Sequence, residues 1–132
     1  MKKISFEKGF NGSYIQKSQE IKINNDTFKP YDLLLAGLAS CFYSTFLDAC
    51  HAAEVEIYGC DVEVDFRKKN TLPRVLETVD LTFNVDTKAN QYQINKLLKQ
   101  AYESCSMVAT IGQSVKINYQ ALIKERFSIY LK

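Results

Sequence analysis

The residues with the clearest capacity for chemistry in this chain are two cysteines, Cys41 and Cys105. Cys41 lies in the apolar run LLLAGLASCF and Cys105 in the run ESCSMVATIG, each on the inward face of an expected helix. A thiol has redox chemistry at neutral pH, and it becomes a useful nucleophile when a nearby cation or helix N-terminus lowers its pKa. The alternative is that both are inert packing, because free cysteine is among the most often buried residues.

The other metal-ligating or nucleophilic side chains are weaker candidates. Cys60 alternates with valines that face inward, so we expect it in the core. His51, the single histidine, directly follows Cys50 near an expected helix end, and neighbouring residues on a helix point in different directions. Zinc needs three or four converging ligands, so we expect a polar helix end here, with no metal site and no cofactor.

Length and composition indicate one globular domain spanning residues 1–132. Hydrophobic residues make up 46% of the chain and charged residues 24%, which are ordinary globular values. The 17 basic and 15 acidic residues are scattered, giving a net charge of +2. A nucleic-acid partner is not expected, since it would need a clustered basic face.

The sequence favours a cytoplasmic protein with reduced thiols. The N-terminal MKKISFEKGF alternates polar and apolar residues and lacks the apolar stretch of a signal peptide. The uncharged run from Leu33 to Leu47 is 15 residues long, short of the roughly 20 that a membrane helix needs. We therefore expect a buried central helix, no membrane association and no disulfide framework.

The first residues of the chain have the pattern of short β-hairpins. Residues 3–6 and 13–23 contain alternating stretches around Gly9 and Gly12, which predicts strands joined by turns.

The middle of the chain predicts a long hairpin. Apolar residues occupy every second position from Cys60 to Phe66 and, except for Glu77, from Val75 to Val85, with NTLPR as the turn between the two segments. The intervening polar residues, Asn84 and Asp86 among them, are expected on the solvent-facing side of the sheet. A last strand is predicted over 115–123, with a continuation through 127–131.

The first predicted helix runs from Pro30 to His51. Pro30 suits a first helical turn, and Asp32 is favourable near the positive end of the helix dipole. The inward face is expected to carry Leu34, Leu38, Cys41 and Thr45. The aromatic residues Phe42, Tyr43 and Phe46 could line an apolar pocket or lie in the core. The core is favoured, because large apolar side chains pack in the core more often than they line a pocket.

The second predicted helix begins near Asn90 and stops at Gly112. Its core stripe comprises Ile94, Leu97, Leu98, Ala101 and Tyr102. Cys105 lies about three turns after Ile94, so it continues the same stripe.

Taken in order, these features resemble the OsmC-like family, which includes the osmotically inducible and organic hydroperoxide resistance proteins. The first shared motif is P-x-[DE]-LLLAxLxxC on a helix, and the second is C-S-x-x-x-x-[IL] followed by a V-x-I-x-Y strand. The matching residues are Pro30, Asp32, Leu33 to Ala36, Leu38, Cys41, Cys105, Ser106, Ile111, Val115, Ile117 and Tyr119.

The resemblance implies an α+β, two-layer fold with antiparallel sheets packed on a central apolar helix. It also implies an intertwined homodimer in which the two thiols lie close together at the subunit interface. In characterised members the first cysteine attacks an organic hydroperoxide and becomes a sulfenic acid, which the second resolves as a disulfide. The peroxidatic role would fall to Cys41 and the resolving role to Cys105.

The supporting groups differ from those of the peroxidase members, which use an N-terminal arginine and a glutamate after the helix-start proline. Tyr31 follows Pro30 here, and the acid comes one position later as Asp32. No arginine precedes Arg67, and Lys17 is the centrally placed basic residue of the hairpin region. Lys17, Asp32 and Tyr31 are therefore the expected supporting residues, and the chain resembles the poorly characterised branch of the family.

Two functions follow from these observations. The first is a thiol-dependent reductase of organic hydroperoxides, fatty ones being expected, which draws electrons from a dithiol carrier. The second is a non-catalytic homodimer that binds a small apolar molecule in an interface cavity and keeps its cysteines for packing. For the first, we expect a positively charged group from Lys17, or from Arg67 or Arg74 of another strand or subunit, to stabilise the Cys41 thiolate.

Overall fold

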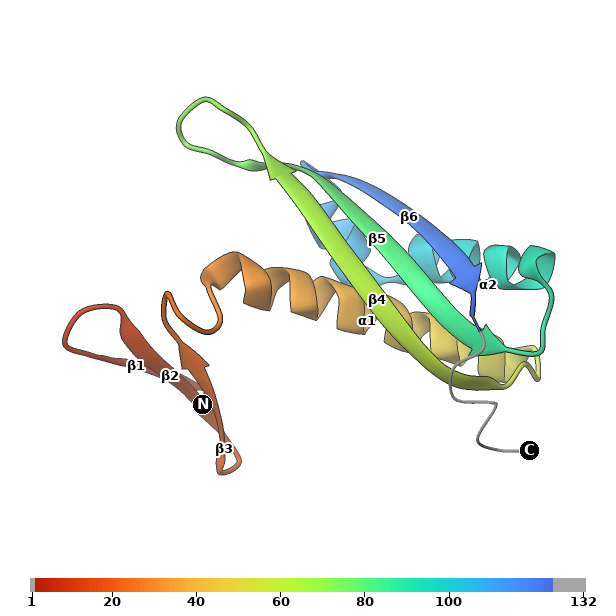
Figure 1. Cartoon of the computed structure of the whole chain (residues 1–132), viewed down its shortest axis with the longest axis horizontal. Coiled ribbons are helices and arrows are strands. Elements are labelled where there is room, and N and C mark those ends of the chain that lie inside the picture. Colours follow the sequence, from red (N-terminus) through yellow and green to blue (C-terminus); the bar gives the residue numbers. More distant parts are fainter. Residues whose placement is uncertain (1, 125–132) are drawn as a thin grey trace. The chain divides into compact units, whose positions relative to one another are not determined.

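The computed structural model describes residues 2–124, and it shows an α+β chain in which two three-stranded sheets accompany helices (Figure 1). In chain order the elements are β1 (Lys3–Glu7), β2 (Asn11–Gln16), β3 (Gln19–Ile23), α1 (Pro30–Ala52), β4 (Ile57–Lys68), β5 (Leu76–Thr87), α2 (Gln91–Ser104), α3 (Ser106–Ile111) and β6 (Lys116–Ile123). Two compact units divide within α1, after Gly37, and each is described separately.

The N-terminal unit is built on an antiparallel sheet in the order β1-β2-β3. The alternating stretch over residues 13–23 forms two strands, because Lys17 and Ser18 both have positive φ angles, of 50° and 66°, and form a two-residue turn. Such a turn matches the twist of the strands that it joins. Glycine usually supplies this conformation, so the alternating pattern did not reveal the turn.

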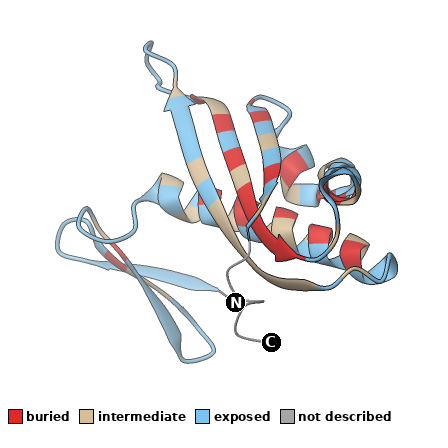
Figure 2. Cartoon of the chain, turned by 45° about the vertical axis from the view of Figure 1, so that its right-hand side comes forward, coloured by how far each residue is buried: buried red, intermediate tan, exposed pale blue. Residues whose placement is uncertain are grey.

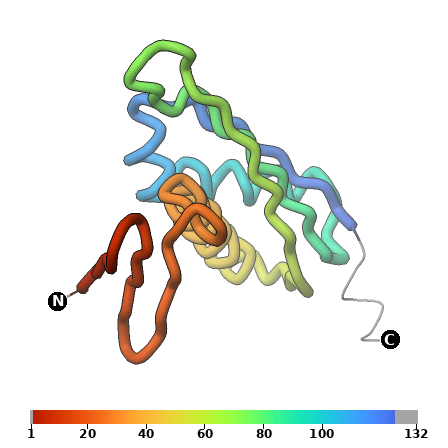
Figure 3. The backbone as a smooth tube through the Cα atoms, turned by 60° about the vertical axis from the view of Figure 1, so that its left-hand side comes forward, coloured from red at the N-terminus to blue at the C-terminus, as the bar shows by residue number. Residues whose placement is uncertain are grey.

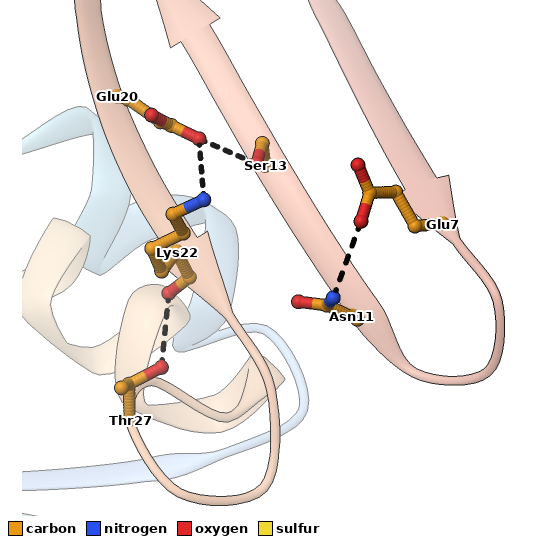
Figure 4. A network of polar contacts seen from close by, with 6 residues as sticks. All are labelled: Glu7, Asn11, Ser13, Glu20, Lys22 and Thr27. Atoms are coloured by element: carbon orange, nitrogen blue, oxygen red, sulfur yellow. Dashed lines mark hydrogen bonds and ion pairs between the residues drawn. The ribbon is translucent and has the colours of Figure 1, made fainter.

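The first turn of this sheet uses Gly9, whose φ is +76°, whereas Gly12 lies inside β2 and not in a turn. Gly12 pairs with Phe6 across the strands, and a Cβ there would come within 2.6 Å of the Phe6 ring. The aromatic ring therefore lies against bare backbone. Figure 4 shows polar pairs that join neighbouring strands of this sheet, including the 2.6 Å hydrogen bond from Ser13 to Glu20.

Helix α1 begins as predicted and is longer than its uncharged run. The backbone N–H of Lys29 donates to Asp32 Oδ2 at 2.9 Å, so this carboxylate satisfies a donor at the helix start. The helix spans 23 residues, which by length and composition alone is enough to cross a membrane. The helix matches the predicted range to within one residue, and it exceeds the 15-residue uncharged run because it continues past both ends of that run; core helices of water-soluble proteins pass the same test of length and composition.

The buried face of α1 is rotated from the predicted one. Leu38 lies on it as expected, but Leu34 is exposed and Cys41 and Thr45 are only half-buried. The side chains that are buried are Leu35, Leu38, Ala39, Phe42, Phe46 and Cys50. The rings of Phe42 and Phe46 pack on Phe83 of β5, with centroids 4.9 and 6.5 Å away, so these aromatic residues are core.

The second sheet has the order β4-β5-β6, and it corrects the expectation of purely antiparallel sheets. Strands β4 and β5 form the predicted antiparallel hairpin, but β5 and β6 run parallel. The chain leaves β5, crosses through α2 and α3, and returns to begin β6 at the other end of the sheet (Figure 3). A crossover of this kind is what parallel pairing requires.

Burial is concentrated on the central strand β5 (Figure 2). The predicted alternation holds for Val79, Leu81, Phe83 and Val85, whereas Val75 is exposed and precedes the strand. Asn84 and Asp86, expected on the wet face, are buried at 8% and 1% exposure. The side-chain N–H of Asn84 donates to Glu63 at 2.7 Å, whereas the buried Asn84 Oδ1 has no hydrogen-bond partner among the described residues. The expected continuation through 127–131 lies outside the described residues.

Candidate active site

Cys41 lies at the edge of the buried face of α1, one residue before the fully buried Phe42. Thr45, one turn later, donates its hydroxyl to the Cys41 backbone oxygen at 2.9 Å. The Phe42 ring contacts both Phe83 and Tyr119 of the sheet, with centroids 4.9 and 5.5 Å away. These contacts fix the rotation of the helix, and with it the direction in which the half-buried Cys41 thiol can point.

Cys105 lies at a break between two helices, where one continuous helix was expected. Helix α2 ends at Ser104, Cys105 has extended angles (φ −77°, ψ 122°), and α3 begins at Ser106. The Cys105 N–H still donates to Ala101, while its carbonyl already accepts from Ala109. The break matters because the first N–H groups of a new helix have no partner within that helix.

The two sulfurs lie together, as expected of a reactive pair. The Cys105 thiol donates to the Cys41 sulfur across 3.4 Å. A disulfide bond measures about 2.05 Å, so a shift of little more than an ångström would join them. Cys105 is 1% exposed and Cys41 is half-buried, so an incoming molecule meets Cys41 first.

The surroundings move the two thiol pKa values in opposite directions. The backbone N–H of Met107 is the largest cause of a lowered pKa at Cys41, followed by the Cys105 thiol and, to a smaller extent, the Ser106 hydroxyl. Burial raises the pKa of Cys105 above its usual range, and the adjoining Cys41 raises it further. The arrangement favours a thiolate at Cys41 beside a protonated Cys105.

Within one chain, the groups that lower the pKa of Cys41 are neutral donors at the start of α3 and the neighbouring thiol. Stabilisation of the thiolate by Lys17, or by Arg67 or Arg74 from another strand or subunit, stays a prediction. In this chain Arg67 is 3.6 Å from Glu77 and largely exposed. Sequence reasoning missed Ser106 and Met107 as contributors, although a serine just before an apolar run is a recognisable helix-start signal.

The remaining two cysteines lie in surroundings that disfavour a thiolate. Burial raises the pKa of Cys50 and of Cys60 to about 11. Both raise the pKa of the half-buried Tyr43, so they lie near its ring. Cys50 is core, while Cys60, predicted to be core, is half-buried.

The other predicted site residues belong to the N-terminal unit. Lys17 is exposed in the β2–β3 turn, and Tyr31 is half-buried in the first turn of α1. Asp32 accepts the hydrogen bond from the Lys29 N–H described above, so its carboxylate stabilises the start of α1. His51 is exposed in the last turn of α1, and residues 2–124 contain no group of three or more side chains placed to hold a metal ion.

Known protein structures share this fold. An OsmC-like protein from Mycoplasma pneumoniae superposes with a TM-score of 0.82 at 18% identity, covering 93% of this chain and 95% of that one. The organic hydroperoxide resistance protein OsmC from Legionella pneumophila gives a TM-score of 0.73 at 18% identity, covering 92% and 96%. The organic hydroperoxide resistance protein OhrB of Bacillus subtilis gives 0.68 at 15% identity, covering 92% and 98%.

No curated protein sequence matches the chain, but a model of a protein family does. The family model described as OsmC-like protein matches residues 23–120, which include both cysteines of the pair and most of the elements described above. The chain therefore belongs to the OsmC-like protein family.

Proposed function

We propose that this protein is a cytoplasmic, thiol-dependent reductase of organic hydroperoxides, with Cys41 as the peroxidatic residue and Cys105 as the resolving residue. One observation carries the proposal: two sulfurs 3.4 Å apart whose pKa values are shifted in opposite directions. Two of the structural relatives are named organic hydroperoxide resistance proteins, which agrees with this chemistry.

The first step oxidises Cys41. Its thiolate attacks the outer oxygen of the hydroperoxide, an S–O bond forms and the O–O bond breaks, which gives a sulfenic acid and an alkoxide. The alkoxide takes a proton and leaves as an alcohol. The thiolate supplies the two electrons, and the Met107 N–H stabilises it by lowering the pKa of Cys41.

The second step uses Cys105. Its sulfur attacks the Cys41 sulfenic acid, the thiol proton is lost, and hydroxide leaves as water, so the two cysteines become a disulfide. A dithiol carrier returns two electrons and two protons. Because Cys105 is buried, it meets the neighbouring sulfur more readily than it meets hydroperoxide from solution.

We also propose that the working form is a homodimer. Large apolar side chains of the N-terminal unit are more than 40% exposed, namely Ile4, Phe6, Phe10, Ile15, Ile21 and Phe28. A sheet this small rarely leaves so much apolar surface in water unless another surface covers it. A second copy is the partner that the family resemblance suggests.

A consumption assay tests the activity. Wild-type protein with dithiothreitol should reduce cumene hydroperoxide, Cys41→Ser should fall to the background rate, and the matched Cys60→Ser should retain activity. Lys17, Tyr31 and Asp32 stay predicted supporting residues, for which substitutions in the same assay are the test. If wild-type and Cys41→Ser proteins are equally inactive, the ligand-binding function becomes the better account.

A further inference from the structure

Helix α3 has little within its own residues to hold its first turn in place. Among Ser106–Ile111, Val108 is the one buried residue. The N-cap residue, Cys105, forms no capping hydrogen bond through its side chain among the described residues. A helix of six residues is too short to be stable in water by itself. The first turn of α3 therefore depends on acceptors that lie outside the helix.

The main acceptor at the start of α3 is the sulfur of Cys41. The Met107 N–H is the largest cause of the lowered pKa at Cys41, and the Ser106 hydroxyl adds a smaller contribution. The N–H groups of Val108 and Met107 also favour a charged Cys105, but burial is the larger effect and keeps the pKa of that thiol raised. When the pair is ionised, its negative charge therefore resides mainly on Cys41.

The stabilisation between this thiolate and α3 is reciprocal. A donor that lowers the pKa of a thiol interacts more strongly with the thiolate than with the neutral thiol. By linkage, the thiolate stabilises the ordered start of α3 by the same free energy. Disulfide formation removes the negative charge and draws the two sulfurs from 3.4 Å to about 2.05 Å. Oxidation of the pair therefore takes from α3 its charged acceptor.

Reduction of the disulfide requires access to a buried sulfur. A carrier thiolate can attack either sulfur, and attack is faster where it expels the thiol with the lower pKa. That leaving group is Cys41, so the favoured attack falls on Cys105. Cys105 is 1% exposed when the thiols are free. Part of the structure that covers Cys105 must therefore move before the carrier reaches it.

We propose that α3 is a redox-sensitive element, whose first turn is held by the Cys41 thiolate and opens when Cys41 and Cys105 form a disulfide. The proposal rests on the proposed function and specifies how the oxidised site meets its reductant. The carrier thiolate bonds to the Cys105 sulfur, the Cys41–Cys105 bond breaks, and Cys41 leaves as a thiolate. The second thiol of the carrier then displaces Cys105, which takes up a proton. With the Cys41 thiolate restored, α3 closes again.

Hydrogen–deuterium exchange tests this without any hydroperoxide. Diamide oxidises the pair directly by taking up two electrons and two protons, and peptide mapping verifies the Cys41–Cys105 disulfide. Exchange of residues 106–112 is compared with that of residues 91–98 in the first half of α2. Two reduced variants, Cys41→Ala and the matched Cys105→Ala, each remove one sulfur from the same contact. Labelling is done at about pH 8.5, where a thiol with a lowered pKa is largely ionised.

We expect the disulfide to speed exchange of residues 106–112 by about tenfold, the factor that corresponds to one pKa unit. Exchange of residues 91–98 should not change. Reduced Cys41→Ala should also exchange faster over 106–112, because the charged acceptor is missing. Reduced Cys105→Ala should stay near the wild type, because the Cys41 thiolate remains. Equal exchange over 106–112 in reduced and oxidised wild type, or in the two variants, would overturn the proposal.

The same proteins separate this inference from the proposed function. Consumption of hydroperoxide by a protein whose α3 exchanges equally in both redox states would leave the peroxidase function standing and refute the opening of α3. Opening of α3 in diamide-oxidised protein that consumes no hydroperoxide would do the reverse, since the redox-sensitive element would exist and the peroxidase function would fail.

Discussion

At the scale of single residues, hydrogen-bond donors distinguish Cys41 from the other cysteines. Cys41 receives a backbone N–H and a hydroxyl from the start of α3, which together with the Cys105 thiol outweigh the penalty of its partial burial. Cys50 and Cys60 lie in surroundings where burial dominates, and their pKa values are about 11. A difference of one pKa unit changes the thiolate fraction about tenfold when the thiol is mostly protonated.

Replacing Ser106 should weaken Cys41 as a nucleophile. We expect Ser106→Ala to raise the pKa of Cys41, so its rate-against-pH curve for iodoacetamide moves to higher pH, while the plateau rate above that pKa stays the same. The loss of alkylation rate near pH 7 should be about a few-fold, because the larger contribution from the Met107 N–H remains.

The exposed Ser114 offers a matched control, since Ser114→Ala removes a hydroxyl beyond the end of α3 and should leave the curve in place. An unshifted curve in Ser106→Ala would show that the Ser106 hydroxyl has no influence on the thiolate.

Residue types and spacing, with the family resemblance, were enough to predict that Cys41 and Cys105 lie together, but not which groups shift their pKa values. Cys41 and Cys105 stand in two separate motifs, each visible in the sequence. The donation from Met107 depends on a backbone N–H, which every residue except proline carries, so only the three-dimensional position of that residue distinguishes it.

At the scale of elements, the thiol site depends on the break between α2 and α3. The apolar stripe of α2 continues to Cys105, so periodicity alone predicted one helix. Periodicity also failed to orient α1, because a helix that is apolar on most sides has no contrast to show which face is buried. The identity of the core was nevertheless correct for Phe42 and Phe46.

Helix α1 should lose stability when its N-terminal carboxylate is removed. Asp32 accepts the Lys29 N–H and lies near the positive end of the helix dipole. We expect Asp32→Ala to lower the free energy of unfolding by about 1 kcal/mol. Urea denaturation followed by circular dichroism would measure this.

Asp48→Ala provides the comparison within the same helix. Asp48 is exposed and lies near the C-terminal end, where a negative charge opposes the dipole, so its loss should be neutral or slightly stabilising. Equal destabilisation by both substitutions would contradict a capping role for Asp32.

At the scale of the whole molecule, the sequence predicted the fold class and the order of elements but not the direction of every strand. Alternation shows that β6 has one buried face, yet it carries no information about parallel or antiparallel pairing. The crossover through α2 and α3 decides that direction. The burial of Asn84 and Asp86 likewise could not be predicted, because polar residues that alternate with apolar ones in a strand normally face the solvent.

The exposed apolar side chains of the N-terminal unit predict that the protein associates with itself. Light scattering at micromolar concentration should give about twice the 15.1 kDa mass of the chain. The physical reason is the cost of leaving side chains such as Phe6 and Phe28, each more than half exposed, in contact with water. A mass equal to one chain would refute the homodimer.

The central claim is that Cys41 and Cys105 form a redox pair, and peptide mapping after one equivalent of cumene hydroperoxide tests it most directly. The account predicts a Cys41–Cys105 disulfide in the wild type, with Cys50 and Cys60 still reduced. Cys105→Ser should instead accumulate oxygen on Cys41, and Cys41→Ser should stay unmodified. Wild-type protein that shows neither the disulfide nor a mass gain at Cys41 would contradict the account.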